Sequence, residues 1–134
     1  MRKVNLIIVF NQSRSQVLMC YRMKHPYKGL YNFVGGKVHD DEDDYTGAYR
    51  ELFEETGISN KDIELKLLFN TYYYDEPVEL QVYYGVLEKS VQLKEEVNPL
   101  IWIDVNEDFC DSNKYAGDGN IQHMMRILES NKVF

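Results

Sequence analysis

Three glutamates lie close together in the middle of the chain, at Glu51, Glu54 and Glu55. Residues three and four apart are neighbours on a helix, so these carboxylates would share one face. A divalent cation would relieve their mutual repulsion, and surroundings made only of carboxylates suit hard ions such as Mg²⁺ or Mn²⁺. The alternative is a solvated acidic face, but such a face usually interleaves lysines with its acids, and only Arg50 is present here.

The negative charge of the chain is concentrated in this region. Residues 40–55 hold eight acidic side chains and one basic side chain, whereas acids and bases balance over the other residues, so this segment accounts for the whole net charge of −7. Such clustering needs solvent or cations to neutralise it. Because no basic stripe compensates elsewhere, we expect no nucleic acid polymer as the main partner.

A glycine pair precedes the acidic helix. Gly35 and Gly36 allow the backbone to approach a ligand closely and to expose a carbonyl group. Glu42 follows near the expected start of the helix, where it could reach the same site. Bound Mg²⁺ could bridge the oxygens of a diphosphate while a carboxylate orients or deprotonates a water.

The segment from Gly36 to Ile58 resembles the signature of the Nudix hydrolase superfamily, G-x5-E-x7-R-E-U-x-E-E-x-G-U, in which U is a bulky aliphatic residue. Every fixed position is filled, by Gly36, Glu42, Arg50, Glu51, Leu52, Glu54, Glu55, Gly57 and Ile58. The chain is most similar to small MutT-like members. The resemblance implies a single domain over residues 1–134 with an α/β (α+β) fold, an α/β/α sandwich around a mixed central sheet.

The resemblance also implies roles for individual residues. Metal would be bound by Glu51, Glu54, Glu55, the carbonyl of Gly35 and an acid from a later loop, for which Glu96 fits best and Glu95 is the alternative. Arg50 would orient a helix carboxylate and Glu42 would support the site. These two, with Glu51 and Glu54, form the expected catalytic set, and the expected cofactor is Mg²⁺, with Mn²⁺ as an alternative. The chain departs from many relatives at residues 40–41, where Asp-Asp replaces Pro-Gly.

Five residues are candidates for substrate binding. Arg22 matches a position that contacts phosphate in MutT-like enzymes, and a solvated arginine at a strand end is the alternative. Asn32 resembles an asparagine just before the signature in nucleotide-sanitising members, and Lys37 lies in the same segment. Asn120 resembles an asparagine that reads the base, although it could instead cap the last helix. Asp118 is a further candidate for the same pocket.

We therefore expect hydrolysis of a nucleoside triphosphate, including oxidised purine nucleotides, to a monophosphate and pyrophosphate. A dinucleoside polyphosphate or nucleotide-sugar hydrolase is the alternative, because Tyr74 lies about 16 residues after the signature, a loose marker of the former class. A non-catalytic nucleotide sensor is a third hypothesis. Such modules usually lose signature carboxylates, and this chain retains them all.

The periodicity of apolar residues predicts the elements that position these groups. Strands are expected over residues 4–10, 16–23, 31–34, 63–74, 80–87 and 99–104, and helices over 43–56 and 121–130. The apolar side of the first helix carries Tyr45, Ala48, Tyr49, Leu52 and Phe53, and that of the second carries Ile121, Met124, Met125 and Leu128.

Two isolated cysteines, Cys20 and Cys110, suggest neither a disulfide framework nor a zinc site. The longest apolar run, residues 6–10, is too short to cross a membrane and makes a poor signal peptide. We expect a cytoplasmic monomer or homodimer whose partner is a small nucleotide and not a membrane.

Overall fold

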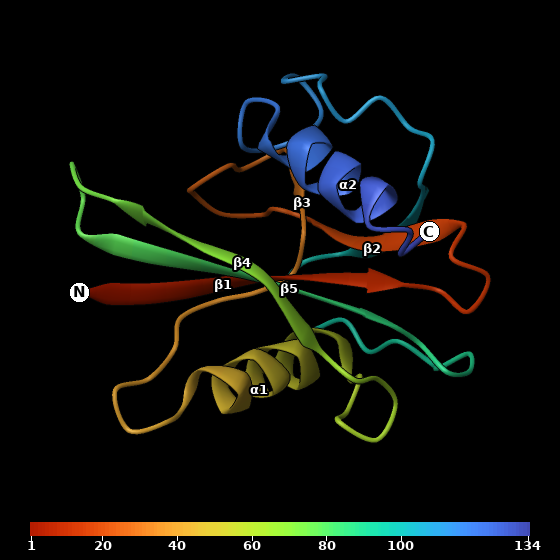
Figure 1. Ribbon diagram of the computed structural model, residues 1–134, viewed down its shortest axis with the longest axis horizontal. Helices are drawn as coiled ribbons and strands as arrows, with labels where there is room; N and C mark the ends of the chain where they lie inside the picture. Colours follow the sequence, from red (N-terminus) through yellow and green to blue (C-terminus); the bar gives the residue numbers. More distant parts are fainter.

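A six-stranded sheet lies between two helices in the computed structural model, which describes residues 1–134 (Figure 1). The strands are β1 (Arg2–Phe10), β2 (Gln16–Tyr21), β3 (Tyr31–Asn32), β4 (Lys66–Tyr73), β5 (Val78–Val86) and β6 (Leu100–Asp104). Helix α1 (Asp44–Thr56) covers one face of the sheet and α2 (Asn120–Ser130) covers the other. The expected sandwich with a mixed sheet is confirmed.

Strand β1 lies at the centre of the sheet, whose strand order is β3-β2-β1-β5-β4, with β6 paired to β2. The pair β1·β5 is parallel and the other pairs are antiparallel. Ile8 and Phe10 pack in the core beside α2, whereas Ile7 and Val9 pack beside α1. Because β1 is covered on both faces, it reads as an almost continuous apolar run.

Helix α1 begins and ends as its sequence predicts. The side chain of its N-cap, Asp43, accepts a hydrogen bond from the amide of Thr46 at 2.9 Å, and Gly57 closes the helix in a left-handed conformation (φ 80°). The tyrosine hydroxyl of Tyr49 accepts a hydrogen bond from the amide of Leu65 at 2.8 Å. The caps set the two ends of α1, and the Tyr49 contact ties the helix to the chain just before β4.

The expected apolar side of α1 is wrong in part. Phe53 is 57% exposed and Tyr45 is 45% exposed, whereas Ala48, Leu52 and Thr56 are buried. These three lie at successive spacings of four residues, so a narrow line of the helix contacts the sheet. Phe53 is one step of about 100° past Leu52 and is therefore turned to solvent.

Four strands, β2, β3, β4 and β6, are shorter than predicted. Past Asn32, β3 gives way to two isolated bridges to β1, between Val34 and Ile7 and between Lys37 and Val4. Strand β4 starts at Lys66 because the chain before it, at Ile63, crosses closely over Gly85 of β5. The buried side of α2 is as predicted, and neither helix has the length and apolar character needed to cross a membrane.

Candidate active site

Arg50 lies at the centre of the acidic cluster on α1. Its guanidinium donates to Glu42 from Nε at 2.9 Å and from Nη2 at 2.7 Å, and from Nη1 to Glu51 at 3.0 Å and Glu54 at 3.1 Å. A further bond from Nη2 to the carbonyl of Lys37, at 2.8 Å, attaches the loop before α1. The guanidinium of Arg50 therefore holds three signature carboxylates in fixed positions.

The carboxylates differ in their tendency to hold a proton. The hydrogen bonds from Arg50 lower the pKa of Glu42 from its ordinary value of 4.5 to about 2. Burial raises the pKa of Glu51, and it raises the pKa of Glu55 to about 7. Desolvation penalises the charged form. Here it outweighs both the ion pair of Glu51 with Arg50 and the hydrogen bond from the Gly35 amide to Glu55.

The Gly35–Gly36 segment, which lies between the bridges of Val34 and Lys37 to β1, packs directly against the helix carboxylates. The amide of Gly35 donates a hydrogen bond to Glu55 Oε2 at 3.0 Å. A Cβ atom on Gly36 would collide with the carboxyl group of Glu51, so a larger residue there would have to displace that side chain. Gly36 therefore leaves room for the carboxylate of Glu51.

These groups fit a hard divalent cation. All candidate donors are oxygens, and the protein gives no hydrogen bond to the Gly35 carbonyl or to Glu54 Oε1. Such an ion would bring positive charge beside Glu51 and Glu55, whose charged forms are disfavoured by burial. No three Asp, Glu, His or Cys side chains converge in the spacing of a ready-made ion site. Glu51 and Glu54 are instead drawn toward Arg50.

The structure separates the two later acids. Glu96 and Glu55 line a cavity of about 50 Å³ together with Cys20. The carboxylate of Glu95 instead accepts a hydrogen bond from the amide of Leu100 at 2.7 Å, at the start of β6. Of the two, Glu96 is therefore the acid that faces the same cavity as Glu55.

A larger cavity of about 680 Å³ opens beside the Gly35–Gly36 segment, on the side of the sheet covered by α2. All five predicted substrate residues line it: Arg22, Asn32, Lys37, Asp118 and Asn120. Gly35 and Gly36 form the part of its wall that adjoins the carboxylates. The two glycines therefore lie between the helix carboxylates, which have metal-binding character, and a cavity of nucleotide size.

Comparisons with known proteins identify the family and the fold of this chain. A family model described as NUDIX domain matches residues 1–118. This chain belongs to the NUDIX family. Over 61 residues, 46% of the chain, it is 38% identical to the RNA pyrophosphohydrolase of Pasteurella multocida (strain Pm70), and the match spans 29% of that protein.

Solved NUDIX structures share the fold at lower identity. The MutT protein from Methanosarcina mazei Go1 is 20% identical with a TM-score of 0.74, over 98% of this chain and 95% of that one. A bifunctional NMN adenylyltransferase/ADP ribose pyrophosphatase from Francisella tularensis, complexed with AMP and Mn ion, is 20% identical with a TM-score of 0.73, over 96% of this chain and 41% of that one. The expected membership, with a MutT-like fold, is confirmed.

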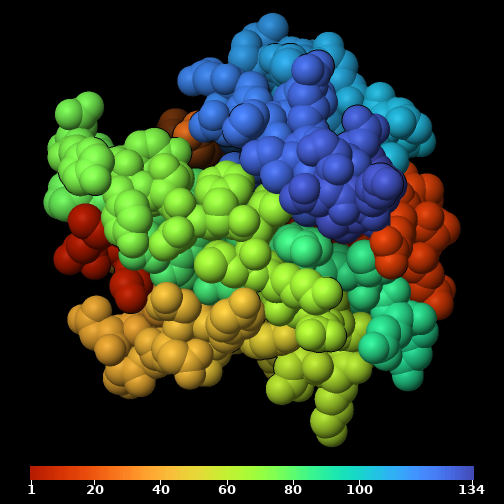
Figure 2. All heavy atoms as spheres, in the orientation of Figure 1, coloured from red at the N-terminus to blue at the C-terminus, as the bar shows by residue number.

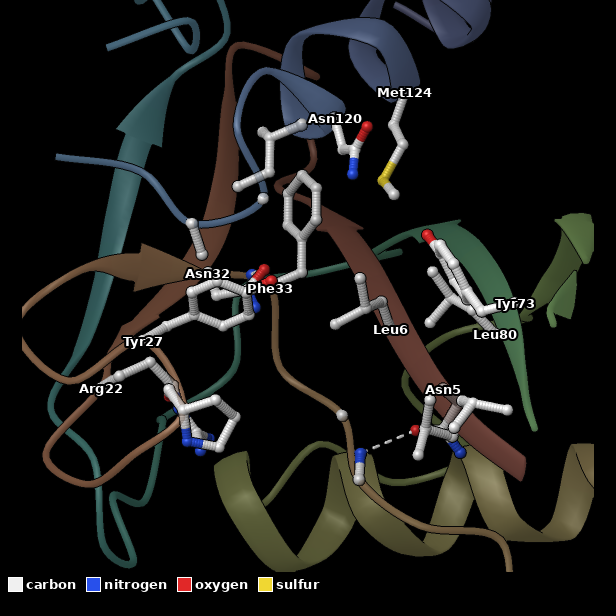
Figure 3. Close-up of a pocket in the computed structure, with 18 of the residues that line it drawn as sticks. Asn5, Leu6, Arg22, Tyr27, Asn32, Phe33, Tyr73, Leu80, Asn120 and Met124 are labelled. Atoms are coloured by element: carbon white, nitrogen blue, oxygen red, sulfur yellow. Dashed lines mark hydrogen bonds between the residues drawn. The ribbon is translucent and has the colours of Figure 1, made fainter. Parts of the chain in front are cut away.

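Asn120 does not cap α2 in this NUDIX domain. The N-cap is Gly119, in a left-handed conformation (φ 92°), and it provides no side-chain cap. The amide group of Asn120 makes no hydrogen bond within the protein and points into the large cavity (Figure 3). The capping alternative is therefore wrong.

Several residues of the site are absent from the sequence-based prediction. Tyr27, Tyr73 and Met124 line the large cavity but carry no motif that marks them (Figure 3). Gly47 makes room for Glu42, because a Cβ there would lie 3.0 Å from Glu42 Oε1. Asn5 accepts a hydrogen bond from the Gly36 amide. The only feature of the sequence that marks Asn5 is that it is the single polar residue in the run 4–10.

Proposed function

We propose that this NUDIX domain hydrolyses a nucleoside triphosphate to a nucleoside monophosphate and pyrophosphate, with Mg²⁺ as the preferred cofactor and Mn²⁺ as a substitute. One observation carries the proposal. The Gly35–Gly36 segment touches the carboxylates of Glu51 and Glu55 on one side and forms the wall of the large cavity on the other. A nucleotide in the cavity would thus present its phosphates to the carboxylates.

Basic side chains support the phosphate end of this placement. Arg2, Arg22 and Lys37 line the cavity. Arg22 is close enough to Glu55 for its charge to oppose the rise in the pKa of that carboxyl caused by burial. An arginine between the cavity and the carboxylates suits a phosphate chain that spans both.

The opposite part of the cavity suits a purine base. Leu6, Leu80 and Met124 provide apolar walls, and Asn120 offers a free amide (Figure 3). An amide donates and accepts at the same time, which matches the edge of a purine. Asn32 adds a donor, because its Oδ1 already accepts from the amide of Phe33 at 2.8 Å while its Nδ2 has no partner in the protein. This set favours purine nucleotides, oxidised purines included.

Glu54 is the best placed proton acceptor. Its side chain is 49% exposed, and Arg50 binds only its Oε2, so Oε1 is free to accept a proton from the attacking water. The water forms a new P–O bond while the bond to the leaving pyrophosphate breaks. A bound divalent ion would polarise the phosphate oxygens and lower the pKa of the water.

Product analysis on a nucleotide panel with Mg²⁺ tests the proposal. The panel holds canonical and 8-oxo nucleoside triphosphates, dinucleoside polyphosphates, ADP-ribose and nucleotide sugars. Pyrophosphate release from triphosphates should fall at least about 100-fold in Glu54→Gln and stay unchanged in Glu129→Gln, an exposed glutamate near the end of α2. Tight nucleotide binding without turnover of any compound would favour the sensor hypothesis.

One observation favours a second candidate, a dinucleoside polyphosphate. Tyr27 and Tyr73 are both about half exposed and lie on opposite sides of the large cavity (Figure 3). Aromatic rings stack on nucleobases, so two such platforms suit a substrate with two bases. The same panel separates the candidates, because two nucleotide products and no pyrophosphate would identify the dinucleoside class.

A further inference from the structure

We propose that Asn5 is a positioning residue that directs the carbonyl of Gly35 toward the cation site. The inference rests on the proposed function, because it concerns how the chain prepares a backbone ligand for the divalent ion. Asn5 lies on β1, outside the signature.

Asn5 binds both polar backbone groups of Gly36. The backbone amide of Asn5 donates to the Gly36 carbonyl at 2.8 Å, and the side-chain Oδ1 of Asn5 accepts from the Gly36 backbone amide at 2.9 Å. Figure 3 shows this side-chain bond as a dashed line between the strand and the loop. Any residue could provide the first bond, whereas the second requires an acceptor at the end of a short side chain.

The side-chain bond fixes more than the amide it touches. The Gly36 amide and the Gly35 carbonyl belong to one planar trans peptide unit, in which N–H and C=O point in opposite directions. When Asn5 holds the N–H toward itself, the carbonyl of Gly35 is directed away from the Asn5 side chain. That carbonyl receives no hydrogen bond from the protein.

The other end of the glycine segment is tied to the helix carboxylates. The amide of Gly35 donates to Glu55 Oε2 at 3.0 Å. A Cβ on Gly35 would collide with the backbone oxygen of Asn5, so the strand and the glycine segment are in direct contact. Gly35 is thus held between Asn5 and Glu55, with only its carbonyl left free for a ligand.

Packing alone does not explain an asparagine at this position. Asn5 is 2% exposed, and its Nδ2 is buried without a partner. Its side chain shares a face of β1 with Ile7 and Val9, which pack in the apolar core beside α1. An unpaired buried donor destabilises the fold. The side-chain oxygen on Gly36 is the contact that offsets this loss.

Two variants and one matched control separate the positioning role from stability. Asn5→Leu keeps the branched shape, removes the acceptor and also removes the unpaired donor. Asn5→Asp keeps an acceptor oxygen. The control is Gln81→Met, because Gln81 pairs with Asn5 in register and is 1% exposed, but bonds only to Glu79 and Tyr83. Asn5→Ala replaces Asn5→Leu where the leucine variant does not fold.

The first readout is hydrogen exchange of the Gly36 amide. Selective ¹⁵N-glycine labelling yields a spectrum of only eight glycines. Exchange should be slow in wild type, Asn5→Asp and Gln81→Met, and at least about tenfold faster in Asn5→Leu. Protection that persists in Asn5→Leu, or is lost in Asn5→Asp, would overturn the proposal.

The second readout is the binding of Mn²⁺ alone, measured by electron paramagnetic resonance. Substitution of a residue that orients a metal ligand typically weakens metal binding by about 10- to 100-fold. We expect Asn5→Leu to weaken Mn²⁺ binding at least tenfold and Gln81→Met to change it less than twofold. Equal affinity in these two variants would overturn the proposal. Neither readout uses the reaction, so absence of turnover in wild type would count against the proposed function alone.

Discussion

Arg50 forms a bidentate ion pair with Glu42, in which Nε lies 2.9 Å from Oε2 and Nη2 lies 2.7 Å from Oε1. The pair joins the loop before α1 to the second turn of the helix, and the amide of His39 adds a third bond to Glu42 at 2.8 Å. Glu42 is thereby committed to holding the loop, while Glu54 keeps a free oxygen.

The Glu42–Arg50 pair predicts a particular dependence of stability on pH. Because the folded state lowers the pKa of Glu42 from 4.5 to about 2, the ion pair stabilises the protein above pH 4.5 and is lost as the pH falls toward 2. Glu42→Gln should therefore be less stable than wild type at pH 7 and equal to it near pH 2. Urea unfolding at pH 7, 4 and 2.5 measures this, and a deficit that does not change with pH would contradict it.

Glu55 should show the opposite sign. Its folded pKa is raised to about 7, so the stability of wild type is greatest below pH 4.5 and falls as the pH rises through 7. In the absence of metal, Glu55→Gln should be more stable than wild type at pH 8 by on the order of 2 kcal/mol, with no advantage at pH 4. Thermal unfolding in a chelator tests this prediction.

Added Mn²⁺ provides the complementary test of Glu55. An ion that binds the folded state raises the melting temperature. Wild type should therefore gain stability at pH 8 with Mn²⁺, and Glu55→Gln should gain little. An equal gain in both proteins would place the ion elsewhere.

Gly47→Ala sets two effects against each other. Alanine favours a helix interior by about 1 kcal/mol over glycine, but its Cβ would lie 3.0 Å from Glu42 Oε1 and 3.2 Å from Val38 Cγ1. We expect the free energy of unfolding to change by less than about 1 kcal/mol and kcat to fall several-fold as Glu42 is displaced. Unchanged kcat in a stable variant would show that Glu42 accommodates the methyl group.

Asn120→Ala tests the base end of the cavity. Loss of one or two hydrogen bonds to the base should raise KM for a purine triphosphate about tenfold, with kcat within twofold, because the base is remote from the reacting phosphorus. Asn131→Ala, an exposed asparagine at the other end of α2, is the matched control. Equal KM values for the two variants would remove Asn120 from the base site.

Local patterns predicted most of the catalytic segment. The signature residues lie on one helix and the segments directly before and after it, and their spacing sets their relative positions. The helical wheel did not reveal how narrow the contact with the sheet is, so Phe53 was wrongly placed inside. The capping alternative for Asn120 failed because the left-handed Gly119 takes the N-cap position.

Local sequence patterns did not predict several contacts between segments that are distant along the chain. Asn5 stands out in its apolar run, but its role depends on the arrival of Gly36 beside β1, which no local pattern encodes. Walls of the large cavity come from β1, β4, β5 and α2, so Tyr73 and Met124 line one cavity only after the sheet has formed.

The parallel pairing of β1 with β5 sets the order in which the site can form. Arg2 pairs with Val78 and Phe10 with Val86, so the central pair closes a loop that contains most of the other elements. Loops of that size close slowly, whereas a helix forms locally and fast. As the chain leaves the ribosome, α1 can form early, but β1 lacks its partner until β5 has emerged. During refolding, protection of the Gly36 amide should therefore lag behind the helical signal of α1.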